Sequence, residues 1–178
     1  MTKKLTFLPN RRFILAAIPA FLAVGCSDRS GHAQISAPEG AGLPPDPSGI
    51  DWASLTEEEW RARLSDDQFY VLREEGTERA FTSALNDEHR DGVFHCAGCD
   101  LPLFSSDAKY NSGTGWPSFF EPLPNAMETK PDNRLWMTRT EYHCMRCKGH
   151  QGHVFSDGPP PTGQRWCNNG VALTFRPA

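Results

Sequence analysis

Two short cysteine pairs constrain the fold of this chain more than any other feature of its sequence. They read CAGC at 96–99 and CMRC at 144–147. A C-x-x-C pair lets two thiolates bind one metal ion from a single turn, and two such pairs supply the four ligands of a closed tetrahedral zinc site. We therefore predict a structural Zn²⁺ that clamps two hairpin ends of one domain. The predicted ligands are Cys96, Cys99, Cys144 and Cys147.

The same cysteines have two other readings. Two disulfides would also account for four cysteines, and an extracytoplasmic location would permit them. A redox-active C-x-x-C is the second alternative, but the βαβ pattern of thioredoxin-like proteins is missing around both pairs. Zinc is preferred, because two pairs of equal spacing match the ligand pattern of a closed site.

The first 33 residues have the pattern of an export signal. Two lysines and the adjacent Arg11-Arg12 precede the apolar run FILAAIPAFLAV, which is shorter than the roughly 20 residues that a membrane-spanning helix needs. The two arginines resemble a twin-arginine signal, and Cys26 lies at a lipoprotein-like processing site, where it would be acylated. A plain signal whose cleavage discards Cys26 is the alternative. Both readings predict an exported protein, either periplasmic or membrane-anchored and facing the extracytoplasmic side.

Residues 34–50 are rich in Pro, Gly, Ser and Ala. They offer too little apolar surface to offset the entropy of ordering, so we predict a flexible tether between the signal and a single folded domain at 51–178. The whole chain carries a formal charge of -4. No nucleic-acid partner is expected, because proteins that bind nucleic acid usually carry a clustered basic surface.

Two short helices are predicted at the start of the domain. Thr56 and Glu59 fit a capping box, and Ser65 fits the N-cap of a second helix that ends at Gly76. Beyond Gly92 the helical pattern gives way to short apolar runs bounded by Gly, Pro and Asp. These runs lie at 93–95, 135–143, 153–155 and 171–175. We predict a mainly β fold: a single antiparallel β domain with short N-terminal helices, clamped by the zinc site.

Cys167 belongs to neither pair. The thiolate is the reactive form of cysteine, and a nearby cation such as Arg165 favours that form. His150 and His153 have the chemistry to protonate or hydrogen-bond a departing oxygen, and Asn169 can donate a hydrogen bond. Taken alone, such a cysteine is more often buried structure, and the histidines are ordinary loop residues or ligands of a second metal. The combination of these side chains favours a nucleophile at Cys167.

Three further segments carry a resemblance to a known family. They read NSGTGWPSF at 111–119, HQGHVFSDGP at 150–159 and RWCNNG at 165–170. Together with the two cysteine pairs, their order and spacing resemble those of the peptide-methionine (R)-S-oxide reductases, the B family of methionine sulfoxide reductases. The resemblance covers residues 55–175, almost the whole predicted domain.

The resemblance implies an enzyme that reduces methionine-(R)-sulfoxide in proteins to methionine. Cys167 would be the nucleophile and would leave the reaction as a sulfenic acid, with His150, His153, Asn169 and Arg165 around it. Trp116 and Asp157 are the predicted substrate-binding residues. Trp116 would form an apolar wall for the S-methyl group, since sulfur–aromatic contacts stabilise by roughly 0.3–1.5 kcal/mol. Asp157 would fix a histidine tautomer or Arg165.

The sequence departs from the family pattern at several positions. Thr114 stands where many relatives have a resolving cysteine, so the chain resembles a one-cysteine variant whose sulfenic acid is reduced by an external thiol. Gln151 replaces the usual Leu, and Asn168 stands where an apolar residue is common. The predicted partners are oxidised methionine-containing proteins and a thiol reductant, with a lipid anchor at Cys26 as a further expectation.

Two other functions stay open at this point. One is a zinc-stabilised binding module without catalysis, which would hold ligands at Trp116 and leave Cys167 unreactive. The other is a reductase of free methionine sulfoxide or of another small sulfoxide. No segment of the sequence has the pattern of a peptide groove, so the residues alone do not separate free from protein-bound substrate.

Overall fold

The computed structural model describes residues 42–134 and 137–178 of the chain. The predicted export signal, Cys26, residues 34–41 of the predicted tether and residues 135–136 lie outside the described residues. Within the described ranges, no helix has the length and apolar character needed to cross a lipid bilayer.

The two predicted N-terminal helices are present, and both begin with a capping box. They are α1 (Glu57–Arg61) and α2 (Asp66–Glu74). In α1 the Thr56 hydroxyl accepts from the Glu59 amide, and the Glu59 carboxylate accepts from the Thr56 amide. Ser65 forms the same reciprocal pair of bonds at the start of α2. Two orphan backbone donors are thus satisfied at each helix start.

Helix α2 ends at Glu74, two residues before Gly76, where the sequence predicted its end. Glu75, not the glycine, adopts the left-handed conformation with φ 56°, and the Gly76 amide donates to the Tyr70 carbonyl. Gly76 lies so close to the Tyr70 ring that a Cβ atom would collide with it. The glycine therefore lets the Tyr70 ring lie against the backbone, and it does not have a positive φ.

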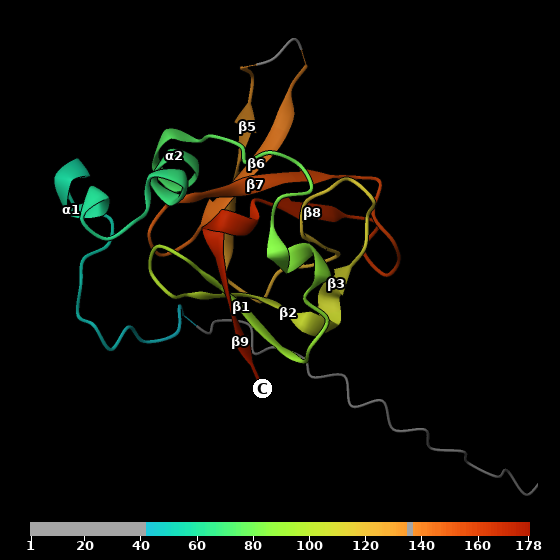
Figure 1. The fold of residues 1–178 in the computed structure, drawn as a ribbon, viewed down its shortest axis with the longest axis horizontal. Helices are drawn as coiled ribbons and strands as arrows, with labels where there is room; N and C mark the ends of the chain where they lie inside the picture. Colours follow the sequence, from blue (N-terminus) through green and yellow to red (C-terminus); the bar gives the residue numbers. More distant parts are fainter. Residues whose placement is uncertain (1–41, 135–136) are drawn as a thin grey trace, which may run out of the picture. The chain divides into compact units, whose positions relative to one another are not determined.

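Nine strands form two antiparallel sheets in the part of the chain that the structure describes (Figure 1). Their bounds are β1 Gly92–Cys96, β2 Pro102–Ser105, β3 Lys109–Tyr110, β4 Ser118–Phe119, β5 Met127–Asp132, β6 Arg139–Cys144, β7 His150–Phe155, β8 Arg165–Asn168 and β9 Leu173–Pro177. The smaller sheet has the order β2-β1-β9, and the larger has the order β3-β4-β8-β7-β6-β5. Three short 3₁₀ helices are also present in the described residues: η1 Ala84–Asp87 precedes β1, η2 Ser106–Ala108 links β2 to β3, and η3 Gly170–Ala172 links β8 to β9.

The predicted mainly β class is confirmed, but the sequence indicated only some of the strands. The run at 135–143 becomes a strand from Arg139, and the run at 171–175 is divided between η3 and β9. Strands β2, β3, β4, β5 and β8 were not predicted. Strands β3 and β4 are two residues long, most of the β5 side chains are exposed, and β8 consists largely of polar residues. Their place in the sheet depends on pairing with neighbours rather than on an apolar pattern of their own.

An aromatic core joins the two sheets. Phe94 and Phe104 come from the smaller sheet, and Phe119 and Tyr142 come from the larger one; all four are fully buried. The rings of Phe104 and Phe119 stack with centroids 4.0 Å apart, and Tyr142 meets Trp166 edge to face at 4.9 Å. Such aromatic pairs stabilise by about 0.5–1.5 kcal/mol beyond the burial of their area. The core thereby holds β8 in a rigid position.

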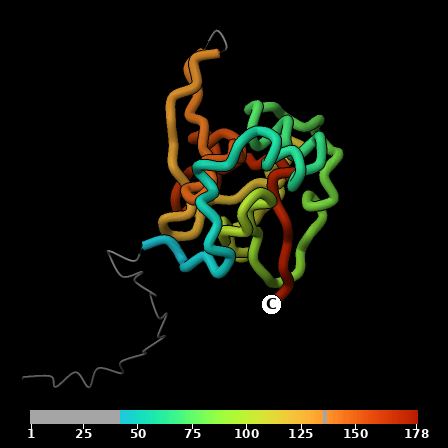
Figure 2. Tube along the Cα trace, turned by 90° about the vertical axis from the view of Figure 1, so that its left-hand side faces the viewer, coloured from blue at the N-terminus to red at the C-terminus, as the bar shows by residue number. Residues whose placement is uncertain are grey.

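Elements far apart in the sequence meet on one side of the larger sheet. Helix α2 packs against β7 and η3. Strands β5 and β6 form a hairpin that extends away from the other strands, as the orange segment of Figure 2 shows. At the beginning of the described chain, the Pro44 carbonyl accepts a hydrogen bond from Arg146, and Asp46 accepts one from the Trp52 indole.

Candidate active site and metal centre

The two C-x-x-C pairs come together in one buried cluster. Their four sulfur atoms lie within 4.8 Å of one another, and no disulfide joins them. The Sγ atoms of Cys96 and Cys147 are 3.6 Å apart, and those of Cys99 and Cys144 are 3.5 Å apart. A tetrahedral site with metal–sulfur bonds of about 2.3 Å places its sulfurs about 3.8 Å apart. The four thiols therefore fit a closed tetrahedral metal site, and the disulfide reading does not agree with these separations.

The two turns of the cluster have the same backbone geometry. The Asp100 amide donates to the Cys96 carbonyl, and the Lys148 amide donates to the Cys144 carbonyl. Asp100 and Lys148 both adopt the left-handed conformation, with φ values of 61° and 59°. Gly98, which the sequence suggested for the tight turn, does not have a positive φ. In each pair it is the residue after the second cysteine that adopts the left-handed conformation.

Two N–H groups point to the cluster sulfurs. The Gly149 amide donates to the Cys147 sulfur over 3.4 Å, and the Gln151 side chain donates to the Cys96 sulfur over 3.3 Å. Donors of this kind reduce the charge that four thiolates bring to a metal site. Arg73 and Arg146 donate to the carbonyls of Cys147 and Cys99 and hold the two turns in place.

Cys167 lies in the middle of the larger sheet, at the wall of a pocket of about 110 Å³. Strand β8 pairs on both sides, so that Cys167 faces Ser118 of β4 and His153 of β7 in register. Unlike the cluster cysteines, it is only partly buried. The pocket is lined by Thr77, Trp116, Arg139, Gly152, His153, Phe155, Cys167, Asn168 and Asn169. The structure thus brings together four of the residues that the sequence predicted, namely Trp116, His153, Cys167 and Asn169.

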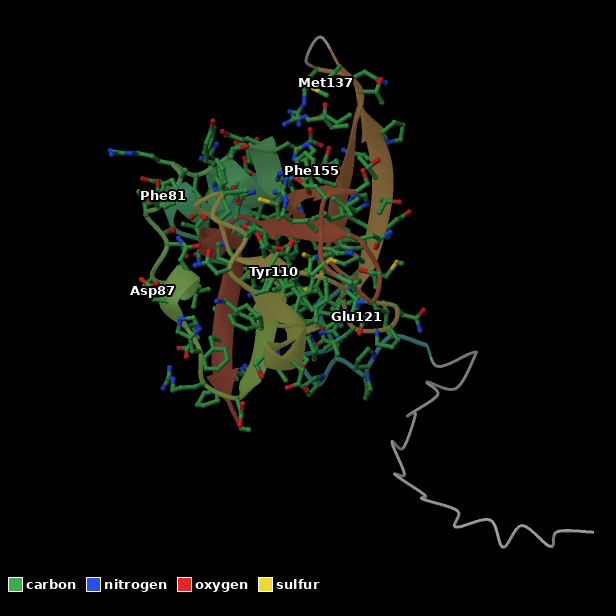
Figure 3. The ribbon with its side chains drawn as sticks, turned by 90° about the vertical axis from the view of Figure 1, so that its right-hand side faces the viewer. Phe81, Asp87, Tyr110, Glu121, Met137 and Phe155 are labelled. Carbon is green, nitrogen blue, oxygen red and sulfur yellow. The ribbon has the colours of Figure 1, made fainter. Side chains whose placement is uncertain are left out.

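Arg165 and Asp157 form a pair beside this pocket instead of lining it. Two parallel hydrogen bonds of 2.8 and 2.9 Å join the Arg165 guanidinium to the Asp157 carboxylate. The guanidinium lies 4.2 Å over the ring of Phe155, which Figure 3 shows between Met137 and Tyr110. Asp157 itself is largely exposed. Of the two predicted roles for Asp157, the structure is consistent with fixing Arg165 and does not bring the carboxylate to the pocket.

The Cys167 thiol experiences two opposing influences. Burial raises its pKa above the ordinary value, because the thiolate loses solvation. The positive charge of Arg165 and hydrogen bonding from the Thr114 hydroxyl lower the pKa and offset part of this effect. The thiol form is therefore favoured in the free protein, and a proton acceptor is needed before Cys167 can attack.

Each of the two predicted histidines is paired with a buried carboxylate. His153 Nε2 lies 2.8 Å from Asp132, and His150 Nδ1 lies 2.8 Å from Glu141. Burial lowers the pKa of both histidines, and the carboxylates oppose that shift only in part. A neutral imidazole has one N–H, and a carboxylate partner claims it. The other ring nitrogen of each histidine is then a hydrogen-bond acceptor.

Asp132 also connects His153 to Arg139. The oxygen that contacts His153 also accepts a 2.6 Å hydrogen bond from Arg139, whose side chain lines the pocket. The backbone amide of Arg134, together with His153 and the two arginines, lowers the pKa of Asp132 well below its ordinary range. Asp132 therefore stays ionised and presents a fixed negative charge to the imidazole.

Trp116 and Asn169 are held by one residue from the loop after α2. The Trp116 indole donates to the Glu78 carbonyl over 3.2 Å, and the Glu78 amide donates to the Asn169 side chain over 3.0 Å. The Glu78 carboxylate accepts from the amides of Gly170 and Val171, at the start of η3. Burial raises the pKa of Glu78. This loop, like the strands, defines the pocket.

Thr114 brings a hydroxyl group close to the Cys167 thiol. Its hydroxyl oxygen lies 4.0 Å from the Cys167 sulfur. Ser112 lies 2.8 Å from both the Thr114 and the Ser118 hydroxyls, and Ser118 donates to the Trp116 carbonyl. A chain of three hydroxyls therefore leads from the thiol to the backbone of the pocket wall.

Comparison with known proteins decides the family. The SelR domain family matches residues 64–177. A protein of Thiobacillus denitrificans named "Peptide methionine sulfoxide reductase MsrB" is 54% identical over 123 residues, which are 68% of this chain and 93% of the relative. The chain belongs to the methionine sulfoxide reductase B family.

Other members show the same extent of similarity. The protein of the same name from Pseudomonas entomophila is 55% identical over 68% of this chain and 94% of its own length. "Peptide methionine sulfoxide reductase B1, chloroplastic" from Arabidopsis thaliana is 49% identical over 69% of this chain and 61% of its own length. Among solved structures, the Mis18 "Yippee-like" domain covers 50% of this chain with a TM-score of 0.40 and 17% identity, a similarity too weak to bear on fold or function.

Several residues of this methionine sulfoxide reductase B site were missed in the sequence. Asp132 and Glu141 are separated from their histidines by 21 and 9 positions. Arg139 and Glu78 lie outside the three family-like segments at 111–119, 150–159 and 165–170. A signal did exist for Glu141. It is a carboxylate next to Tyr142 in an otherwise strand-like run, and a charge that a strand buries needs a partner.

Proposed function

We propose that this chain reduces methionine-(R)-sulfoxide in proteins to methionine, with Cys167 as the nucleophile. The observation that carries the proposal is the pocket in which Cys167, His153 and Trp116 converge. A partly exposed thiol beside an imidazole and an indole has the groups that attack on a sulfoxide needs: a nucleophile, a proton carrier and an apolar surface.

The reaction uses the proton of the Cys167 thiol. That proton moves to His153, its register partner, and the thiolate attacks the electrophilic sulfur of the sulfoxide. The attack forms an S–S bond between Cys167 and the substrate sulfur, and the proton passes from His153 to the substrate oxygen. The hydroxyl then moves to the Cys167 sulfur: the substrate S–O bond and the S–S bond break, and a new S–O bond forms on Cys167. The products are methionine and a Cys167 sulfenic acid, so one sulfur is reduced by two electrons and the other is oxidised by two.

In this scheme His153 accepts the proton as a neutral imidazole and donates it to the oxygen as an imidazolium. Its Nε2–H is committed to Asp132, so the other ring nitrogen, Nδ1, has no hydrogen to donate until it takes up a proton. A sulfoxide oxygen accepts hydrogen bonds and donates none. The Asp132 carboxylate stabilises the protonated ring, and His150 with Glu141 forms a second pair of the same kind beside it.

Arg165 and Asn169 serve this step from opposite ends of the Cys167 segment. Arg165, held by Asp157, stabilises the thiolate through its charge. Asn169 lies at the pocket between Gln151 and Glu78, where its amide donates to the Gln151 carbonyl. In this proposal Trp116 forms the wall against which the S-methyl group packs.

An external thiol regenerates Cys167. Thr114 occupies the position 4.0 Å from the nucleophile, and a hydroxyl cannot form a disulfide with a sulfenic acid. With the four cluster cysteines buried, Cys167 is the partly exposed cysteine of the described residues. The sulfenic acid is therefore open to a reductant of the thiol class that enters through the substrate pocket.

We propose that the four-cysteine cluster holds a structural Zn²⁺. The sulfur separations and the donor set support zinc, since four thiolates in a closed tetrahedral arrangement leave no position for a water molecule or substrate. Bound there, the ion would contribute to folding and take no part in the reduction. Metal analysis of the purified protein by mass spectrometry, with one zinc ion per chain expected, tests the identity of the metal.

Export of the chain is also proposed, with twin-arginine transport and acylation of Cys26 as its specific form. The charges, the short apolar run and the Cys26 context of residues 1–33 support this. A lipid at Cys26 followed by the tether at 34–50 would hold the reductase domain off the membrane surface. Fractionation of cells that produce the full chain, with the mass of the mature N-terminus, distinguishes acylation from plain cleavage and from no export.

The R and S epimers of a capped methionine sulfoxide, incubated with the protein and dithiothreitol, test the proposed function. We expect conversion of the R epimer alone and, with the reductant omitted, one oxygen atom added to the peptide that contains Cys167. A protein that binds the sulfoxide but converts neither epimer would instead be the binding module. Comparing free with capped methionine sulfoxide measures the preference for protein-like substrates.

A further inference from the structure

A buried polar bridge runs from the cysteine cluster to the strand that carries Cys167. Gln151 of β7 is fully buried, and its Nε2 donates to the Cys96 sulfur over 3.3 Å. Its Oε1 accepts a 3.2 Å hydrogen bond from the Asn168 side chain. Asn168 is also fully buried, follows Cys167 directly and lines the pocket. A single side chain thus contacts a ligand of the metal site and a wall of the substrate pocket.

The remaining polar atoms of this bridge have partners as well. Asn168 accepts from the Tyr142 hydroxyl over 2.9 Å and donates to the Asn169 carbonyl over 2.8 Å. The Gln151 carbonyl accepts from both the backbone and the side-chain N–H groups of Asn169, at 2.8 and 3.0 Å. Gln151 therefore holds both residues that follow the nucleophile.

Gln151 and Asn168 are two of the positions at which the sequence departs from the family pattern, where apolar residues are usual. The structure shows that these departures are hydrogen-bond partners. A buried amide is unfavourable unless its donors and acceptors are satisfied, and two amides facing each other satisfy that demand mutually. The pair has the character of one joint feature of this chain rather than two independent substitutions.

Only one orientation of the Gln151 side-chain amide allows hydrogen bonds to both Cys96 and Asn168. When its NH₂ group faces the Cys96 sulfur, its oxygen faces the Asn168 amide. A rotation by half a turn would place the oxygen against the sulfur and the NH₂ group against another donor. A thiolate bound to a metal is a strong acceptor of N–H hydrogen bonds, so a filled metal site favours the first orientation.

We propose that Gln151 is a positioning residue that couples the metal site to the substrate pocket, so that a metal ion in one and a ligand in the other stabilise each other. The inference rests on the proposed zinc site and the proposed substrate. Because coupling between two bound groups is reciprocal, it is measurable from the metal side without any turnover.

Three variants test the first half of the coupling: Gln151→Leu, Asn168→Val and the double variant. Metal release to a chromophoric chelator and the thermal unfolding midpoint are measured for each. Loss of one hydrogen bond predicts roughly two- to tenfold faster release in Gln151→Leu. The double variant should unfold at a higher temperature than Asn168→Val. Both lack the acceptor of the Tyr142 hydroxyl, but only Asn168→Val also leaves the Gln151 amide oxygen without its donor. Metal release from the double variant should stay fast, because the N–H···S bond is still missing.

Gln164→Leu is the matched control. Gln164 is exposed, and its side chain accepts from the Trp166 indole without contact to the cluster. The same change of residue type should leave metal release at the wild-type rate. Release that is equally fast in this control, or unchanged in Gln151→Leu, overturns the proposal.

The second half is tested with ligand bound and chemistry blocked. In a Cys167→Ser background, saturating capped methionine sulfoxide should slow metal release roughly two- to tenfold, the effect of one hydrogen bond. The slowing should vanish when Gln151→Leu and Asn168→Val are added. Slowing that persists there shows that the coupling runs by another route and contradicts the role of Gln151. The metal content and ligand binding of the Cys167→Ser protein test the proposed function. The ratio of its metal-release rates without and with ligand tests the coupling.

Discussion

The cysteine cluster and the Cys167 pocket place the same functional group in opposite surroundings. In the cluster, four sulfurs lie within 4.8 Å of one another, and all four residues are buried. In the pocket, one partly exposed sulfur has an imidazole, a guanidinium and hydroxyls around it. The first arrangement fits four thiolates that share a metal ion, and the second leaves one sulfur accessible from the pocket.

The comparison shows that reactivity here depends on which partners surround a thiol and not on burial alone. Burial raises the pKa of Cys167, which by itself would make it less reactive. What distinguishes it from the cluster cysteines is an open side toward the pocket and a register partner, His153, that can take its proton. Five substitutions test this difference between the two sites.

Cys167→Ser should have the largest effect. We expect turnover of the capped R sulfoxide to fall by at least about a thousandfold, because a serine hydroxyl is a far weaker nucleophile than a thiolate. Zinc content and the thermal unfolding midpoint should stay at the wild-type values. Substantial residual turnover would remove Cys167 from the mechanism.

Cys99→Ser breaks the other side of the comparison. A structural zinc site contributes about 10–16 kcal/mol to folding in zinc-finger peptides, so one missing ligand is a large loss for a domain of this size. We expect a thermal midpoint at least about 15 °C lower, or no cooperative transition, with loss of bound metal. Cys167→Ser is the matched control. Unchanged stability in Cys99→Ser would show that the cluster is not a structural metal site.

Asp132→Asn weakens the proton carrier while keeping the shape of the side chain. The fixed anion beside His153 disappears, so the pKa of His153 falls further and the imidazolium becomes scarcer. Single-turnover rates should drop by about 10- to 100-fold, and the deficit should shrink as the pH is lowered, because acid restores the protonated ring. Asp107→Asn, an exposed carboxylate of η2, is the control. A deficit independent of pH would point to misfolding instead.

Thr114→Cys places a second thiol next to Cys167, so that this cysteine, like those of the cluster, has a cysteine neighbour. The Thr114 hydroxyl lies 4.0 Å from the sulfur, so a thiol at this position could attack the sulfenic acid. We expect a disulfide between the two positions after one turnover without reductant, visible as a loss of two hydrogens by mass. The reductive step itself should change by less than about threefold. A sulfenic acid that persists in this variant would show that the two side chains do not reach each other.

Arg165→Met should have the smallest effect, and it tests the charge alone. The guanidinium lowers the pKa of Cys167 against the effect of burial, so its removal moves that pKa upward. The pH profile of Cys167 alkylation by iodoacetamide should shift toward higher pH, with the direction as the decisive result. Arg61→Met, an exposed arginine of α1, should leave the profile where it was.

Local features of the chain were predictable to a useful degree. The capping box at Thr56, the N-cap at Ser65 and the two C-x-x-C turns depend on residues three or four positions apart, where the backbone itself determines the geometry. The mainly β class followed from short apolar runs. By contrast, β5 and β8 lack such a run, and their pairing comes from neighbours that lie far away in the chain.

The family, the two cysteine pairs and the separate position of Cys167 could therefore be inferred from the sequence. The surroundings of Cys167 became known only from the fold. Asp132 meets His153 across three strands, and Gln151 meets both Cys96 and Asn168. These contacts depend on the register between strands, which no local spacing encodes, because register follows from how the whole sheet packs on its core.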